Sequence, residues 1–159
     1  MTAVPLLAML LFSPTPEPES WRWNLPDWCR SAVERSEKQM RVTLSNRLNP
    51  YYLQGDFDGD AKLDLAVLVS AAANRKSGIL VVFRDRPETV LVGAGVPLGA
   101  GGDDFSWMDA WSVRPRGPIE GAGAPPRLRG DALLVEKSES ASALVYWDGK
   151  AFRWYQQGD

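Results

Sequence analysis

The sequence predicts an α+β fold, in which a mostly antiparallel sheet of six or seven strands carries one N-terminal helix on a face. Three observations support this prediction. Residues 21–40 are the one segment with helical apolar spacing, short apolar segments separated by turns follow from residue 51, and no helical pattern separates successive strands. Parallel strands would need long crossover connections, which are missing from this pattern. The sequence leaves open whether the sheet closes into a barrel or a sandwich.

The N-terminal 20 residues are expected to lie outside the folded domain. Residues 1–12 form an apolar run that is too short to span a bilayer, and a proline-rich polar stretch follows at residues 13–20. This pair resembles a secretory signal peptide followed by a linker, so we expect a secreted or periplasmic protein without stable membrane insertion of the mature chain. The alternative is that residues 1–12 form an apolar N-terminal strand of a cytosolic protein.

Composition predicts a single domain over residues 21–159 and excludes several classes of function. A chain of 159 residues with 45% hydrophobic content can bury a sizeable core. The formal charge is −2 and no basic face is apparent, which makes nucleic acid an unsuitable partner. The chain has no histidine, which excludes Ser-His-Asp and Cys-His catalysis and histidine-bound zinc. The lone Cys29 is expected to be a small buried residue.

The predicted helix covers residues 21–40. Pro26 and Asp27 suit its first turn, because a missing N–H is harmless there and the helix dipole favours an acid. Its apolar positions recur at i, i+3, i+4 and i+7, which predicts a helix lying on a sheet and burying Trp28. These positions are Leu25, Trp28, Cys29, Ala32, Val33 and Met40.

Seven segments are expected to form the strands. They are rich in β-branched or apolar residues and are bounded by turn residues. Asp148-Gly149 predicts a type I′ turn between the last two strands, with aromatic side chains paired across that hairpin. The glycine- and proline-rich residues 93–130 are expected to form a long loop over one edge of the sheet. The predicted strands are residues 51–54, 64–70, 79–84, 89–92, 131–137, 143–147 and 151–155.

An aspartate-rich stretch lies between the first two of these strands. Its four aspartates fall at positions 1, 3, 5 and 9 of a loop counted from Asp56. Carboxylates on alternate residues of a tight loop converge on one point, which favours a hard cation with oxygen ligands. The candidate ligands are the side chains of Asp56, Asp58, Asp60 and Asp64 and the carbonyl of Lys62.

The spacing of this loop differs from that of an EF-hand, which needs a bidentate glutamate at position 12, where this chain has Val67. The runs Asp56-Phe57-Asp58-Gly59-Asp60 and Asp64-Leu65-Ala66-Val67 instead resemble the calcium loop of FG-GAP/VCBS-type repeats. The resemblance covers roughly residues 52–69 and implies calcium held by these carboxylates between two adjacent strands. Ala61 departs from the family at position 6, where glycine is usual because φ is positive. The motif occurs once, and a propeller needs at least about four blades, so a full propeller is excluded.

A metal-free interpretation of the loop stays open. Each aspartate could instead cap backbone N–H groups in an Asp/Gly-rich turn. Under both interpretations, we expect the loop to have a structural rather than a catalytic role. A calcium site supports export, because a weak site fills only where the ion is abundant.

A second group of candidate residues lies in the glycine-rich region. Paired acids beside tryptophans can grip a sugar ring or act as a general acid and base. The alternative is a turn whose tryptophans pack onto the sheet. This candidate ligand surface consists of Asp103, Asp104, Trp107, Asp109 and Trp111.

We therefore expect an exported, non-enzymatic domain of structural or interaction type, stabilised by one calcium loop. The alternative functions are a carbohydrate-binding module that uses Trp107 and Trp111, and an aspartate-based hydrolase. The partner would be an unidentified protein or a glycan.

Overall fold

The computed structural model describes residues 20–120 and 124–158. The expected signal peptide and nearly all of the expected linker lie outside this part of the chain. The helices are η1 (Ser20–Asn24), α1 (Asp27–Met40) and η2 (Gly99–Gly101). The strands are β1 (Val42–Leu44), β2 (Tyr52–Gly55), β3 (Asp64–Ala71), β4 (Ser77–Val82), β5 (Thr89–Gly93), β6 (Ala110–Arg114), β7 (Ala132–Lys137), β8 (Ala141–Trp147) and β9 (Phe152–Gly158).

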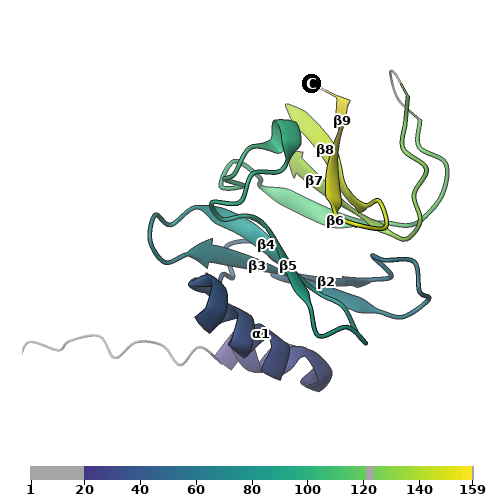
Figure 1. Cartoon of the computed structure of the whole chain (residues 1–159). Coiled ribbons are helices and arrows are strands. Elements are labelled where there is room, and N and C mark those ends of the chain that lie inside the picture. Colours follow the sequence, from purple (N-terminus) through teal and green to yellow (C-terminus); the bar gives the residue numbers. More distant parts are fainter. Residues whose placement is uncertain (1–19, 121–123, 159) are drawn as a thin grey trace, which may run out of the picture.

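The described strands form two antiparallel sheets, which confirms the predicted fold class and corrects the prediction of a single sheet. The first sheet has five strands in the order β1-β3-β4-β5, with β2 also paired with β3. The second has four strands in the order β6-β7-β8-β9. The sheets lie one above the other, and α1 covers the outer face of the five-stranded sheet (Figure 1). Over the described residues, neither sheet closes into a barrel, and the strands do not form a propeller.

Helix α1 forms as its sequence predicts. Pro26 stands at the N-cap, and the chain leaves the helix at Arg41, which has a left-handed φ of 54°. Cys29 and Val33 are buried against the sheet, whereas Trp28 is only partly buried and lies under the guanidinium of Arg84. The helix therefore covers one face of the five-stranded sheet, as expected.

Strand β3 is buried on both faces, which explains its nearly continuous apolar sequence. Leu65 and Val67 face α1, and Ala66 and Leu68 face the four-stranded sheet. Strand β4 has the same two-sided burial. A single sheet would leave one of these apolar faces in water, so the burial of both faces requires the second sheet.

The glycine-rich region is not one long loop, because β6 lies inside it. Trp111 and Val113 of β6 pack into the core between the sheets. The segment after β6 brings Ile119 and Leu128 against the outer face of the four-stranded sheet, where Ala132 and Leu144 are also buried.

The β8–β9 hairpin has a different turn from the one that was expected. Trp147 pairs with Phe152, so four residues connect the strands instead of a two-residue type I′ turn. The carboxylate of Asp148 accepts the N–H groups of Lys150 and Ala151, at 2.8 and 2.9 Å, and stabilises this longer loop. Tyr146 pairs with Arg153, and the aromatic pair across the hairpin is Trp147 with Phe152, whose ring centroids lie 5.2 Å apart.

Within the described residues, we find no helix that has both the length and the apolar character needed to span a membrane.

Candidate metal centre

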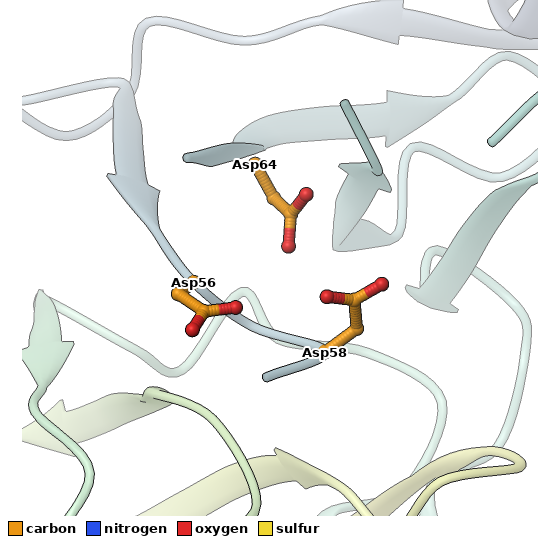
Figure 2. Close-up of side chains that lie close together, drawn as sticks. All are labelled: Asp56, Asp58 and Asp64. Carbon is orange, nitrogen blue, oxygen red and sulfur yellow. The ribbon is translucent and has the colours of Figure 1, made fainter. Parts of the chain in front are cut away.

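The aspartate-rich loop connects β2 to β3, and the Gly55–Asp64 pair closes it. The side chains of Asp56, Asp58 and Asp64 each offer a carboxylate oxygen, and these three oxygens lie within 4.8 Å of one another. Figure 2 shows the three carboxylates pointing toward a common point. Three such oxygens could hold a metal ion.

Backbone hydrogen bonds to two of these carboxylates give the loop its shape. Asp56 accepts the N–H of Gly59 at 2.8 Å and the N–H of Ala61 at 3.0 Å. Asp58 accepts the N–H of Asp60 at 3.1 Å. Short-range bonds of this kind are typical of aspartate turns, and they hold both carboxylates on the inner side of the loop.

Asp64 is the most deeply buried acid of the group. It is 1% exposed, and its two carboxylate oxygens accept the N–H of Phe57 at 3.0 Å and the N–H of Arg84 at 2.9 Å. Burial, opposed by these hydrogen bonds and reinforced by the nearby charge of Asp58, raises the pKa of Asp64 from 3.8 to about 6. The ionised carboxylate is therefore electrostatically unfavourable here without a cation.

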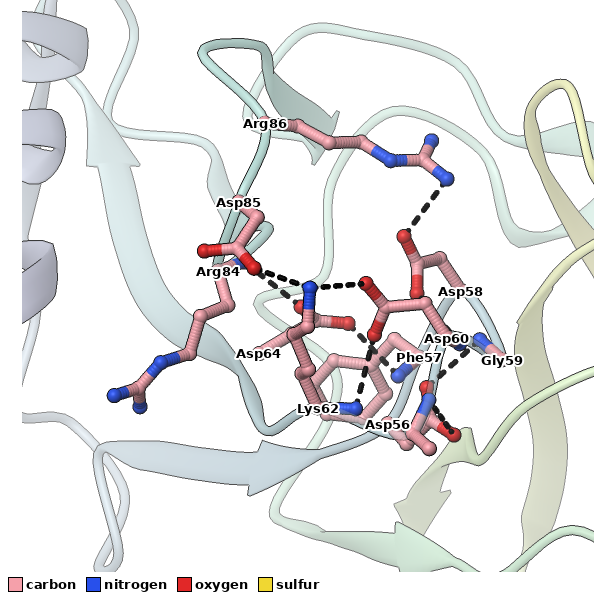
Figure 3. A network of polar contacts seen from close by, with 11 residues as sticks. Asp56, Phe57, Asp58, Gly59, Asp60, Lys62, Asp64, Arg84, Asp85 and Arg86 are labelled. Atoms are coloured by element: carbon pink, nitrogen blue, oxygen red, sulfur yellow. Dashed lines mark hydrogen bonds and ion pairs between the residues drawn. The ribbon is translucent and has the colours of Figure 1, made fainter.

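Two basic side chains lie beside the group (Figure 3). Arg86 Nη2 lies 2.9 Å from Asp58 Oδ2, although the side chain of Asp58 is only 1% exposed. That oxygen forms an ion pair but accepts no hydrogen bond in the described structure. The Lys62 ammonium pairs with Asp85 and lies 3.8 Å from Asp60. Protein cations thus balance part of the negative charge.

Asp60 is the one expected carboxylate that lies outside the converging group. Its Oδ1 accepts the N–H of Lys62 at 2.9 Å, and its side chain is turned toward the Lys62 ammonium (Figure 3). Ala61 has a φ of 69°, the left-handed conformation that favours glycine at this position. The alanine therefore carries backbone strain, and the loop keeps the shape that the glycine would allow.

The loop also contacts the four-stranded sheet, and the residues that make this contact were not foreseen from the sequence. The N–H of Asp131 donates to the Asp56 carbonyl at 2.6 Å, and the Asp131 carboxylate accepts the N–H of Asp56 at 3.0 Å. Phe57 is fully buried in the core between the sheets. A Cβ on Gly130 would come within 2.2 Å of the Asp56 carbonyl oxygen, so only glycine permits this approach.

The sequence contains little that identifies the residues that contact the aspartate-rich loop. Gly130-Asp131 is a turn signal just before a predicted strand, but no local pattern indicates that it meets a loop more than 70 positions earlier. Phe57 stands between two aspartates, and its burial follows from the pairing of the two sheets rather than from the loop itself.

The two tryptophans of the expected surface lie in different surroundings. Trp111 is 6% exposed, and its indole N–H donates to the Pro50 carbonyl at 2.7 Å. Trp107 is half-buried and packs edge to face against Trp154, with the ring centroids 6.1 Å apart. Trp107 and Trp111 therefore do not form a shared exposed platform.

The three aspartates of that surface have structural partners. Asp103 pairs with Lys76, and Asp104 accepts the N–H of Ser77 at 2.9 Å. Asp109 pairs with Lys137 at 2.9 Å, and this ion pair, together with hydrogen bonds from Ser138, lowers the pKa of Asp109 to about 2. Each of the three carboxylates is therefore held by a basic side chain or a backbone N–H group of the fold.

Comparisons of the chain with protein-family models, with curated proteins and with solved structures found no match. The similarity of the loop to FG-GAP/VCBS-type repeats thus stays a prediction.

Proposed function

We propose that this protein is an exported, non-enzymatic domain of structural or interaction type, and that its β2–β3 loop binds one calcium ion. The convergence of the Asp56, Asp58 and Asp64 carboxylates is the observation that carries the proposal. In this proposal, the ion stabilises the junction between the two sheets.

The chemistry of the group fits calcium. All three side-chain donors are carboxylates, the hard oxygen ligands that calcium takes in flexible geometry. Magnesium usually binds through one or two carboxylates and keeps several waters, so three convergent carboxylates favour the larger ion. The Lys62 carbonyl, which is position 7 of the loop, would supply a neutral ligand of the kind found in other calcium loops.

The charges in the loop also favour a bound cation. Two neighbouring ionised carboxylates repel each other, and burial strengthens this repulsion because the local dielectric is lower than in water. Arg86 offsets the charge of Asp58, but Asp64 is buried and its oxygens accept only backbone N–H groups within the described residues. A divalent ion would favour the ionised form of Asp64.

The proposed ion would act on the fold through the contacts of the loop. The backbone of Asp56 is hydrogen-bonded to Asp131, and Phe57 is anchored in the core. Fixing the carboxylates of Asp56 and Asp58 would therefore hold the loop against the four-stranded sheet. The benefit is greatest in a compartment where calcium is abundant, which agrees with the proposed export.

Thermal unfolding with and without calcium tests this proposal. For a site with a Kd of about 10⁻⁴ M, about 5 mM calcium should add about 2 kcal/mol of stability, which raises Tm by roughly 5–9 °C. The variant Asp58→Ala should lose the response, and Asp27→Ala, which removes an exposed acid of helix α1 that is not one of the converging carboxylates, should keep it. Equal Tm values for the wild type with calcium and with chelator would refute the proposal.

A further inference from the structure

The outer edge of β9 has backbone groups that the described part of the chain does not pair. β9 is the last strand of its sheet, and β8 is its partner. The N–H of Asp148 donates to the carbonyl of Ala151, which fixes the phase of the hairpin. Because bonded and non-bonded pairs alternate along antiparallel strands, the backbone N–H and C=O groups of Phe152 and Trp154 point away from β8.

A groove runs along this edge. It has a volume of about 690 Å³, and residues 97–100 also line it. Trp154 and Phe152 line it from the inner face of β9, and Arg153 and Tyr155 line it from the outer face. An added strand would contact both faces in this way, because its side chains alternate from one face to the other.

The inner wall of the groove is held in place before any partner binds. Gly101 packs directly against the Trp154 ring, where an added Cβ would come within 2.4 Å of a ring carbon. Trp107 and Phe105 contact the same ring from other sides, with centroid distances of 6.1 and 6.0 Å. A fixed aromatic wall lowers the entropic cost of binding a partner.

The hairpin end of the groove is basic. Arg153 lines the groove and pairs with Asp148 at 2.6 Å, and Lys150 is exposed in the same hairpin loop. The Arg129 guanidinium lies against Gly149, where an added Cβ would come within 2.3 Å of Nη1. The hairpin end thus carries three basic side chains and one acid, which favours a partner with acidic residues at this end.

We propose that the β9 edge binds an extended, acidic polypeptide segment as an additional strand of the four-stranded sheet. The main-chain groups of Phe152 and Trp154 provide the hydrogen bonds, and Arg153 and Lys150 attract the acidic end of the segment. A second copy of the whole domain would bring its own 97–100 segment to the same edge. The proposal does not depend on the calcium site.

Titration with synthetic peptides, followed by backbone-amide NMR and by tryptophan fluorescence, tests the proposal. The probes are acetyl-Glu-Glu-Val-Thr-Val-Thr-Val-amide and its reversed sequence, which place the acids at the hairpin end for either strand direction. At least one probe should shift the amide signals of Phe152 and Trp154. Methylating alternate backbone nitrogens on the bonding edge of that peptide should weaken binding at least tenfold.

Two variants and one matched control assign the binding to the groove. Arg153→Glu, at an exposed position, should weaken binding of the acidic peptide by about tenfold. Ala100→Trp should block the groove, because Ala100 is one of the residues that line it. Lys38→Glu makes the same change in charge on α1 and should leave binding unchanged. A peptide affinity that is unchanged by N-methylation or by Arg153→Glu would overturn the proposal. So would an absence of shifts at millimolar peptide, or sedimentation showing that β9 pairs two copies of the chain.

Discussion

Raising the pH from about 4 to about 7 without divalent cations should destabilise this protein through Asp64. The burial of Asp64, with the charge of Asp58, raises its pKa from 3.8 to about 6 in the folded state. As the pH rises, the unfolded chain therefore releases this proton before the folded chain does. The stability that the protonated form contributes is complete below about pH 3.8 and is lost as the pH rises through about 6.

The magnitude follows from the size of the pKa change. A rise from 3.8 to about 6 corresponds to about 3 kcal/mol, at about 1.36 kcal/mol per pKa unit. The side chain is almost completely shielded from solvent, so the interaction is not strongly screened. A loss of this size is a large fraction of the roughly 5–15 kcal/mol that stabilises a typical domain.

Urea unfolding at a series of pH values, in chelator, measures the effect. Asp64→Asn keeps the size of the side chain and one acceptor oxygen but does not titrate. Because the other acids titrate in both proteins, the difference between wild type and variant isolates Asp64. That difference should change by about 2 kcal/mol between about pH 4 and about pH 7, because the unfolded chain is already partly ionised at about pH 4. A difference that stays constant over this range would refute the reasoning.

Three further outcomes follow from the structure. Ala61→Gly should stabilise the cation-free protein by about 0.5 kcal/mol, because the φ of 69° strains alanine. Urea unfolding measures the gain, and an unchanged free energy of unfolding would show that the loop tolerates the alanine without strain. Gly101→Ala should lower the free energy of unfolding by about 1–3 kcal/mol, because the added Cβ would lie 2.4 Å from the Trp154 ring. Gly117→Ala is the control, since its Cβ would meet nothing closer than 4.0 Å. Equal unfolding free energies for the two variants would contradict this prediction. Burial raises the pKa of Cys29 to about 11. Iodoacetamide at about pH 8 should therefore alkylate this thiol far more slowly in the native protein than in the chain unfolded by urea. Equal alkylation rates would disprove its protection.

Local patterns in the sequence predict much of this fold. The helix, the β2–β3 and β3–β4 connections and the three C-terminal strands follow from apolar spacing and turn residues. β1 is not predictable in this way, because three residues give too little periodicity, and β6 is obscured by the glycine and proline on both sides. The division into two sheets depends on the long-range pairing that buries both faces of β3 and β4.

The candidate site is partly predictable for the same reason. The spacing of Asp56, Asp58 and Asp64 within one loop indicates their convergence. The Asp60 carboxylate can point toward the loop centre or toward Lys62, and spacing alone does not determine which orientation it adopts. Contacts with Arg86 and Asp131 come from other parts of the chain and depend on the completed fold.

Other departures have an identifiable cause. Trp111 was expected beside Trp107 on a surface, but the β6 strand turns its side chain into the core, where Pro50 accepts its N–H. The turn at Asp148-Gly149 is longer than the dipeptide predicts, because the Asp148 carboxylate satisfies two further backbone N–H groups.

The most direct test of the central claim is a calorimetric titration of calcium into the cation-free protein near pH 7. We predict saturable binding of one ion per chain, with a Kd in the range of about 10⁻⁴ to 10⁻³ M that is typical of extracellular sites. An absence of saturable binding up to tens of millimolar calcium would contradict it.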